Sequence, residues 1–579
     1  MRGPTWRLLA AALAAPAALS SAVRGQYEPP ASYYTPATGL TGTALRNALH
    51  EIIRGHTVVS YANARWALQV LDPNPSNPNE LRLFYTGEML NLLPLSASGI
   101  NGWDSGVSWQ REHVWPRSRQ VTSPGDPTDT GADFSDLHML RPIGSINQTR
   151  SNLNFGGNGS GVSGTSPLAG TTNVGGVTYF YPGVMDRGDA ARAAMYAAVR
   201  YDGRDANTVN LQLVNGNPAS ATGQLGDLQS LLRYHYEDPP DLPERRRNHL
   251  IFSAAAWASE PRPANWNGGS SYTQGNRNPF IDRPELAWSI FSPTPNDSQI
   301  AAGVSAVDLG RVIAGAASST LTATVPLTKT GSAPTYYEVV TTGGARASNS
   351  GRFNAFSYGP QNATSTVWLD TSTTTAGLRS GQVTYRNLDV TSSGPGRGSA
   401  DADDVVNLTL TVLAPGRASL DAAGEVKSLS VSFGAVDVGS AATQTLRLHN
   451  LVSVAGFTAG LDIDAVTLTA TPPPGGVTGH FGSSGAAVFA TDLSPTLVPI
   501  DAGDFRDFSV TFTPVHGGAF AATLTIGVSD EDLPGAMTRP SLVVQLSGVG
   551  VVVVPEPAGL AVLVMAAGWL GVSGRRARR

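Results

Sequence analysis

The spacing of apolar positions divides the chain into two regions of different periodicity. Between residues 26 and 298, the Ala-rich segment 189–201 and the segment 225–236, with leucines at helical spacing, predict helices. Residues 152–176 are rich in Gly, Ser, Thr and Asn and predict a long loop. From residue 299 to 553, short alternating runs separated by turn residues predict strands. The chain therefore joins a region that contains helices to an all-β region.

A third helix has a start signal of its own. Asp241 is suited to be its N-cap, Pro243 lies in its first turn and Glu244 completes a capping box. This pattern predicts a helix that runs through the three consecutive arginines 245–247 to about residue 258.

The alternating region contains an internal repeat. Residues 308–315 read Asp-Leu-Gly-Arg-Val-Ile-Ala-Gly and align with residues 432–439, which read Ser-Phe-Gly-Ala-Val-Asp-Val-Gly, at an offset of 124 positions. An alternating strand follows each copy. We therefore predict two tandem β-sandwiches, over residues 299–417 and 418–553. They resemble the Ig-like, choice-of-anchor-type modules of bacterial surface proteins.

Composition excludes several classes of protein. With 579 residues the chain is too long for one hydrophobic core, and 41% hydrophobic residues suffice for several cores. The absence of cysteine excludes disulfides, a thiolate zinc site and a cysteine nucleophile. Residues 26–300 contain 20 Arg against 24 Asp and Glu, so this region as a whole is not the basic platform that nucleic-acid binding normally uses.

The two ends of the chain predict export. Arg2 and Arg7 precede an apolar run over residues 8–19 and then small residues, which is the order of a signal peptide, here placed at 1–25. Residues 554–579 comprise Val-Pro-Glu-Pro, 17 uncharged residues and an Arg-rich tail. This segment resembles the PEP-CTERM sorting signal of Gram-negative envelope proteins. The resemblance implies a transmembrane helix in the inner membrane, an exosortase-like processing enzyme as partner, and final attachment at the surface or release. The alternative is a permanent C-terminal anchor.

Two segments carry candidate chemistry. Residues 109–118 read Trp-Gln-Arg-Glu-His-Val-Trp-Pro-Arg-Ser, and residues 136–152 contain Asp-Leu-His and Ile-Asn-Gln-Thr-Arg-Ser-Asn. Glu112 and Asn147 offer oxygen ligands of the kind that Mg²⁺ prefers. His113 titrates near neutrality and can accept a proton from water. We interpret His138 as a structural histidine.

These segments closely resemble the bacterial endonuclease I, or extracellular nuclease, family. Three later blocks agree in order: 187–192, 244–248 and 274–282. The resemblance spans about residues 45–290 and implies an α+β nuclease domain with a His-Me finger, or ββα-metal, active site. The predicted fold class is thus multidomain: this domain over 26–298, two all-β Ig-like sandwiches and a C-terminal transmembrane helix.

The resemblance also implies roles for particular residues. His113 is the expected general base, while Glu112 and Asn147 are expected to hold one divalent ion, Mg²⁺ or another. The expected substrate contacts are Arg117, Arg150 and Arg277.

A regular strand would direct Glu112 and His113 to opposite faces. Both groups can therefore serve one phosphate only if the strand ends or twists there, and Pro116 makes an ending plausible.

The sequence leaves three hypotheses for function. The first is a secreted or surface-sorted, metal-dependent endonuclease that cleaves DNA, and RNA as a possible second substrate, with little sequence preference. The second is an extracellular ribonuclease of the same fold. The third is a surface adhesion protein with an inactive nuclease domain. We also expect residues 26–298 to fold and act alone, with a modest and fairly polar contact to the sandwiches.

Overall fold

The computed structural model describes residues 27–120, 135–163, 169–206, 208–390, 401–471 and 488–553. The predicted signal peptide 1–25 and the predicted sorting segment 554–579 lie outside these residues. Residues 121–134, which follow the candidate segment 109–118, also lie outside them. Within the described ranges, no helix has both the length and the apolar character needed to span a membrane.

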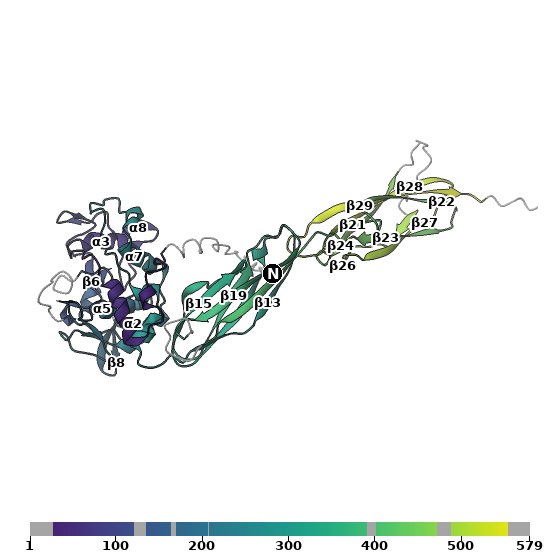
Figure 1. Ribbon diagram of the computed structural model, residues 1–579. Coiled ribbons are helices and arrows are strands. Elements are labelled where there is room, and N and C mark those ends of the chain that lie inside the picture. Colours follow the sequence, from purple (N-terminus) through teal and green to yellow (C-terminus); the bar gives the residue numbers. More distant parts are fainter. Residues whose placement is uncertain are drawn as a thin grey trace, which may run out of the picture. The chain divides into compact units, whose positions relative to one another are not determined.

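The N-terminal region, residues 27–298, contains helices and short strands (Figure 1). Its helices are η1 Thr35–Ala37, α2 Gly42–Ile53, α3 Ala64–Leu71, η2 Arg117–Arg119, α4 Asn147–Arg150, α5 Arg187–Arg200, α6 Leu228–Glu237, α7 Leu242–Phe252, α8 Ala254–Ser259, α9 Pro279–Asp282 and α10 Leu286–Phe291. Its strands are β1 Pro73–Asn74, β2 Asn77–Arg82, β3 Met89–Asn91, β4 Ser96–Ala97, β5 Ile100–Asn101, β6 Gln110–His113, β7 Leu140–Ile143, β8 Gly170–Val174, β9 Val177–Tyr181, β10 Gln212–Leu213 and β11 Gln224–Leu225.

Helix α5 lies at the centre of the main core of this region. It packs against α2, α6 and α9, and its residues Ala190, Ala194 and Ala197 are fully buried. Alanine favours the helix, and its small side chain lets neighbouring helices approach closely. The Ala-rich segment that predicted this helix is therefore the part of the region that other helices cover.

The start of α7 is confirmed, but its predicted end is wrong. The Asp241 side chain accepts a hydrogen bond from the Glu244 backbone N–H at 2.8 Å, as an N-cap does. The helix stops at Phe252, and Ser253 caps a separate helix, α8, by accepting from Ala256 N. A serine hydroxyl that caps a new helix competes with continuation of the old one.

The predicted loop 152–176 also contains structure. Residues 170–174 form β8, which pairs antiparallel with β9. Thr171, Thr172 and Asn173 are all polar, so the sequence of β8 lacks the alternation of apolar and polar residues that predicts a strand. Pairing with the aromatic strand β9 decides the conformation of β8.

The all-β region consists of two modules with the same strand order. The first has strands β12 Gln299–Ala302, β13 Ala306–Ile313, β14 Thr322–Thr330, β15 Thr335–Thr342, β16 Ala345–Ala347, β17 Gly351–Phe356, β18 Gln361–Leu369, β19 Gly377–Asn387 and β20 Asp404–Leu413. The second has β21 Ala418–Ser419, β22 Ser428–Asp437, β23 Ala442–Asn450, β24 Leu461–Thr471, β25 Phe489–Thr491, β26 Thr496–Ile500, β27 Phe505–Phe512, β28 Gly518–Asp530 and β29 Thr538–Val551.

Each module pairs a four-stranded with a five-stranded sheet. The orders are β12-β14-β18-β16 and β13-β20-β19-β15-β17 in the first module, and β21-β23-β27-β25 and β22-β29-β28-β24-β26 in the second. Adding nine to each strand number of the first module gives the order of the second, so the internal repeat seen in the sequence is confirmed. Buried and exposed residues alternate along most long strands, such as β14 and β28, as expected where each sheet turns one apolar face to the core.

Contact between the N-terminal region and the first module differs from the expectation. Residues 27–309 and most of the first module form one compact unit. Tyr236 of α6 and Trp288 of α10 form a buried cluster with Ala333, Tyr336 and Leu388 of the first module, which we call the aromatic joint. The ring centroids of Tyr236 and Tyr336 are 4.9 Å apart. The prediction of a fairly polar contact is therefore wrong at this joint.

Polar contacts surround the aromatic joint. Tyr236 Oη donates to Asp389 Oδ1 at 2.8 Å, and the buried Asp389 also accepts from the backbone N–H of Tyr336. Burial raises the pKa of Asp389 to about 8. Arg352 of the first module donates to Glu285 Oε1 at 2.9 Å. Apolar burial and directed polar contacts thus hold the two parts together.

Candidate active site

The candidate site is built on a strand–strand–helix unit. Strands β6 and β7 pair antiparallel, with Glu112 opposite Arg141 and His113 opposite Leu140. The short helix α4 follows β7. Strand β6 ends at His113, before Pro116, as the sequence indicated. Gln110 and Glu112 share one face of the strand, and Arg111 and His113 share the other.

Glu112 is buried near the end of β6 and is 3% exposed. Its Oε1 atom accepts from Tyr85 Oη at 3.1 Å and lies 3.3 Å from Arg150 Nε. Burial raises the pKa of Glu112 to about 7, although Arg150 and the Tyr85 hydroxyl lower it. Both contacts use Oε1.

Asn147 is placed on the same side of β6 by helix α4. Its Nδ2 donates to Gln110 Oε1 at 2.6 Å, and Gln110 shares a face with Glu112. One turn later on α4, Arg150 reaches Glu112. The helix therefore carries Asn147 along the Glu112 face of the strand, where its amide nitrogen is engaged by Gln110.

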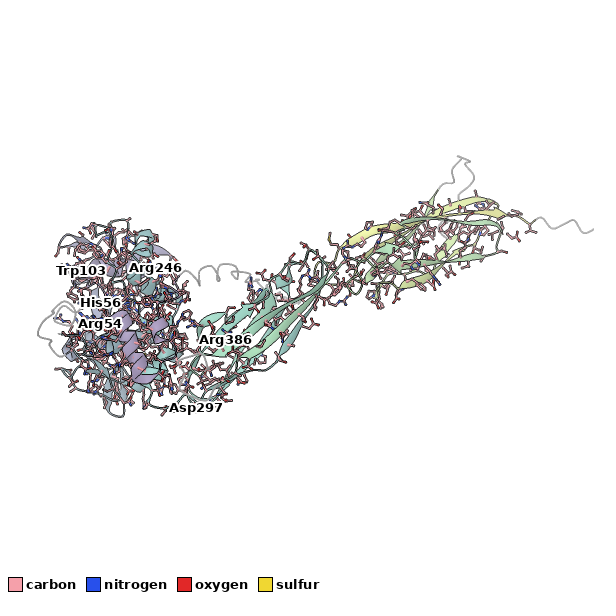
Figure 2. All side chains as sticks on the ribbon, in the orientation of Figure 1. Arg54, His56, Trp103, Arg246, Asp297 and Arg386 are labelled. Carbon is pink, nitrogen blue, oxygen red and sulfur yellow. The ribbon has the colours of Figure 1, made fainter. Side chains whose placement is uncertain are left out.

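His113 lies at the end of the opposite face. Its imidazole stacks on the ring of Tyr61, with centroids 5.4 Å apart and an interplanar angle of 29°. The Arg111 guanidinium carbon lies 3.4 Å from the centroid of the same Tyr61 ring. The Arg111 guanidinium carbon also lies 5.3 Å from the ring centroid of Trp103, which is labelled in Figure 2.

Two of the three predicted substrate contacts need correction. Arg117 is exposed on η2, where a phosphate can reach it. Arg277 is fully buried and donates to both oxygens of Asp282 at 2.7 Å. Arg150 is also fully buried, and it donates to the backbone carbonyls of Val114 and Leu153. These two arginines hold the fold together, and we withdraw them as surface contacts.

The Asp-Leu-His block forms a buried polar network beneath the hairpin. Asp136 accepts hydrogen bonds from the hydroxyls of Tyr196 and Tyr201, each at 2.8 Å, and from Gln274 Nε2 at 3.2 Å. His138 is 2% exposed, and its Nε2 lies 3.4 Å from the Asn276 carbonyl oxygen. This burial agrees with the structural interpretation of His138.

His138 should make the stability of the protein sensitive to acid. Burial lowers its pKa from 6.5 to about 3, so the unfolded state binds one more proton at this site between these values. The stability that neutral His138 provides is complete above pH 6.5 and is lost as the pH falls. The difference in unfolding free energy between wild type and His138→Gln should therefore shrink by about 1.4 kcal/mol per pH unit below pH 6.5. Urea titrations at several pH values measure it, and a constant difference would contradict the expectation.

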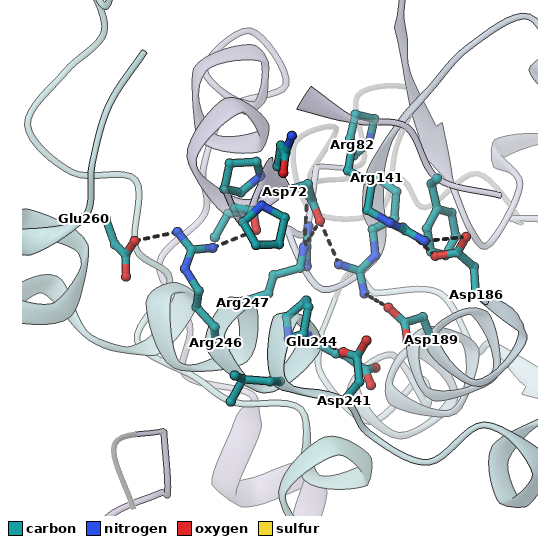
Figure 3. Close-up of a pocket in the computed structure, with 18 of the residues that line it drawn as sticks. Asp72, Arg82, Arg141, Asp186, Asp189, Asp241, Glu244, Arg246, Arg247 and Glu260 are labelled. Atoms are coloured by element: carbon teal, nitrogen blue, oxygen red, sulfur yellow. Dashed lines mark hydrogen bonds and ion pairs between the residues drawn. The ribbon is translucent and has the colours of Figure 1, made fainter. Parts of the chain in front are cut away.

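A cavity of about 570 Å³ opens beside β7 (Figure 3). Its charged side chains pair with one another: Arg247 Nε lies 2.9 Å from Asp72 Oδ1, and Arg82 NH1 lies 2.7 Å from Asp186 Oδ1. Six carboxylates face four guanidinium groups in the lining. This excess of negative charge does not suit a phosphate, so we place the chemistry at the β6 hairpin.

The three arginines 245–247 are likewise engaged within the fold. Arg245 pairs with Glu28 at 3.1 Å, Arg246 with Glu260 at 2.6 Å and Arg247 with Asp72. At least twelve of the 20 arginines of residues 26–300 form such ion pairs. The cluster that stands out in the sequence is therefore a structural one.

Tyr61 and Tyr85 are the site residues that sequence reasoning missed. Tyr61 precedes α3 and Tyr85 lies between β2 and β3, so both are far in the chain from residues 109–118. Neither belongs to a recognisable motif. Only the packing of distant segments against β6 brings them to Glu112 and His113.

The chain is similar in sequence to known nucleases. The model of the endonuclease I family matches residues 41–258. An extracellular ribonuclease of Bacillus amyloliquefaciens is 36% identical over 261 residues, which are 45% of this chain and 78% of that protein. An extracellular ribonuclease of Bacillus subtilis is 34% identical over 280 residues, 48% of this chain and 82% of that protein.

The chain was also compared with solved structures. PapD-like domain 7 of human CEP192 matches 24% of this chain and 87% of that chain, with 16% identity and a TM-score of 0.19. The family match covers the strand–strand–helix unit that carries Glu112, His113 and Asn147, and both ribonucleases are more than 30% identical to this chain over more than two thirds of their own length. The chain therefore belongs to the endonuclease I family.

Proposed function

We propose that the protein is an exported, divalent-metal-dependent endonuclease that hydrolyses phosphodiester bonds with little sequence preference. The observation that carries the proposal is the arrangement around β6. Glu112 and Asn147 lie on one side of this strand, linked through α4, and His113 ends it. This strand–strand–helix order is the one that the predicted ββα-metal site requires.

The residues present fit a single hard cation. Glu112 supplies a carboxylate oxygen and Asn147 an amide oxygen, which are the ligand types that Mg²⁺ prefers. Among the described residues no cluster of three or more His, Asp or Glu side chains is arranged to hold a metal. Two protein ligands leave room for water and substrate oxygens. When bound, Mg²⁺ would neutralise the charge that develops on the phosphoryl and leaving oxygens.

His113 is the proposed general base. It accepts a proton from the attacking water as the new bond between the water oxygen and phosphorus forms. The bond between phosphorus and the leaving oxygen breaks, and that oxygen takes a proton from solvent. Arg117 is exposed and directly follows Trp115-Pro116, and we propose that it contacts a flanking phosphate.

RNA is the substrate with a specific observation in its favour. Both curated relatives reported above are named extracellular ribonucleases. We therefore propose that the protein cleaves RNA and also DNA, because hydrolysis by an external water does not require a 2′-hydroxyl group. The same relatives support export, while surface attachment through residues 554–579 remains part of the proposal. The inactive-adhesin hypothesis is disfavoured because all three chemical groups are present.

The proposed function is tested by incubating the purified full chain with plasmid DNA and with structured RNA, with and without EDTA. Cleavage of both substrates that EDTA abolishes and Mg²⁺ restores is the expected result. Cleavage of RNA alone would establish the ribonuclease alternative. No cleavage of either substrate in Mg²⁺, Mn²⁺ or Ca²⁺ would overturn the proposal.

The two proposed metal ligands give a separate prediction. Glu112→Gln and Asn147→Ala should each raise the half-activating Mg²⁺ concentration by about 10-fold or more, because each removes or weakens one of two protein ligands. Gln148→Ala, on the exposed face of α4 next to Asn147, is the matched control and should leave it unchanged. Equal half-activating concentrations in all four proteins would move the metal site elsewhere.

A further inference from the structure

Two tyrosines contact the two reactive residues of β6 from opposite sides of the strand. Tyr85 reaches Glu112 through its hydroxyl group, and Tyr61 reaches His113 through the face of its ring. The two contacts differ in kind, because one is a hydrogen bond and the other is a ring stack. They can therefore be removed separately by substitution.

Tyr85 is held firmly at both of its polar ends. Its side chain is 1% exposed, and its backbone N–H donates to Asp186 Oδ2 at 3.1 Å. Asp186 is itself fixed by Arg82, at 2.7 and 3.2 Å. The backbone of Tyr85 adopts φ +69°, a left-handed conformation that bulky residues rarely adopt. Such a conformation persists only where the surroundings impose it, and functional sites often contain one.

The Tyr85 hydroxyl group directs one oxygen of Glu112. It donates to Oε1, the atom that also faces Arg150, so the carboxylate is fixed through one oxygen. A ligand held in this way needs little reordering when an ion binds to its other oxygen. Hydrogen bonds of this kind to metal ligands orient the ligand and raise affinity for the metal.

Tyr61 restrains His113 on the opposite side. The Arg111 guanidinium group lies against the ring of Tyr61, and an Arg111 N–H also donates to the Tyr61 carbonyl oxygen. Arg111 and His113 share one face of β6, so Tyr61 contacts both side chains that project from it. A cation on an aromatic face holds the ring, and the ring in turn limits rotation of the imidazole.

We propose that Tyr85 and Tyr61 are the positioning residues of this site, Tyr85 for the metal ligand Glu112 through its hydroxyl group and Tyr61 for the base His113 through its ring. The proposal rests on the proposed function. The proposed roles require different groups of the two side chains. Tyr85 needs its oxygen, whereas Tyr61 needs only its aromatic ring.

The test compares Tyr85→Phe, Tyr61→Phe and Tyr61→Ala in the full chain. Tyr85→Phe should weaken Mn²⁺ binding, measured by calorimetry on the protein without substrate, by about 10-fold, with kcat at saturating metal within threefold of wild type. Tyr61→Ala should lower kcat about 10- to 100-fold with KM and Mn²⁺ affinity within threefold, because a misplaced base slows only the chemical step. Tyr61→Phe should restore kcat to within threefold of wild type.

Two control variants remove comparable groups elsewhere. Tyr234→Phe deletes a buried hydroxyl group that donates to the Gly157 carbonyl oxygen, and Trp66→Ala deletes an α3 ring that stacks on Tyr272. Neither change should reproduce the effects at Tyr85 or Tyr61. Thermal unfolding midpoints identify any variant that simply fails to fold, and Tyr61→Phe then decides the role of the ring.

Several results would overturn the proposal. They are unchanged Mn²⁺ affinity in Tyr85→Phe, unchanged kcat in Tyr61→Ala, or a Tyr61→Phe variant as slow as Tyr61→Ala. A measurement in the absence of substrate separates this failure from failure of the proposed function. In protein labelled with ¹³C-histidine, Tyr61→Ala should shift the His113 ring signal, assigned from its loss in His113→Ala, because the ring current of Tyr61 is lost. That shift is expected whether or not the protein cleaves nucleic acid, and its absence would contradict the stack.

Discussion

Replacing His113 with alanine is expected to lower the rate of nucleic-acid cleavage by about 10²- to 10⁴-fold, the usual cost of losing a general base. His113 ends β6, one residue after the proposed metal ligand Glu112, and His138 is buried with a pKa lowered to about 3. His138 therefore cannot readily take over the proton transfer. Initial rates on plasmid DNA and on RNA at saturating Mg²⁺ measure the effect.

The same variant should keep its metal site. Calorimetric titration of His113→Ala with Mn²⁺ should give an affinity within a few-fold of wild type, because Glu112 and Asn147 are untouched. His516→Ala, on an exposed loop of the second module, is the matched control and should retain full activity. A His113→Ala protein that cleaves within a few-fold of the wild-type rate would remove His113 from its proposed role.

Cutting the chain after residue 298 is expected to destabilise the N-terminal region. The cut removes Tyr336 and Leu388 from the aromatic joint and leaves Tyr236 and Trp288 without their cover. It also deprives the buried Glu285 of Arg352. Loss of one buried aromatic contact costs about 3–5 kcal/mol, which corresponds to a fall of roughly 10 °C in the unfolding midpoint of a domain of this size.

Fragments 26–298 and 26–417 make the comparison direct, since only the longer one keeps the first module. Circular dichroism should give the lower midpoint for 26–298, and size-exclusion chromatography should show its self-association through the newly exposed rings. In the full chain, Tyr336→Phe should be mild and Tyr336→Ala severe. Equal midpoints for the two fragments would restore the original expectation that residues 26–298 are independent.

Local signals in the sequence predicted the elements that depend on local physics. The cap at Asp241 and the alternating strands of the repeat are examples, because each depends on residues close together in the chain. The break between α7 and α8 was missed because Ser253 acts only when its hydroxyl group competes with the next turn of helix. The candidate residues 112 and 113 belong to a recognisable motif, whereas the two tyrosines that contact them come from distant segments.

Arginines show where reasoning from residue type alone goes wrong. Arg277 and the run 245–247 suggest phosphate contacts, yet each guanidinium group pairs with a carboxylate of the same region. The block Arg187-Gly188-Asp189 is also explained by packing within the fold. A Cβ on Gly188 would lie 2.0 Å from the Asp238 carbonyl oxygen, so glycine is needed where α5 begins against this loop.

The pairing of the first and last long strands of the second module determines how much distance the module adds between the segments on either side of it. Strands β22 and β29 run parallel, from Ser428 beside Val543 to Asp437 beside Val551. The chain thus begins and leaves this sheet at opposite ends, separated by ten residues of extended strand, or about 33 Å. A module with its first and last residues at opposite ends adds its own length to the distance that the chain spans, whereas a module whose ends meet would add almost none. Each further copy inserted in series would lengthen the path between the segments before and after it by a similar step.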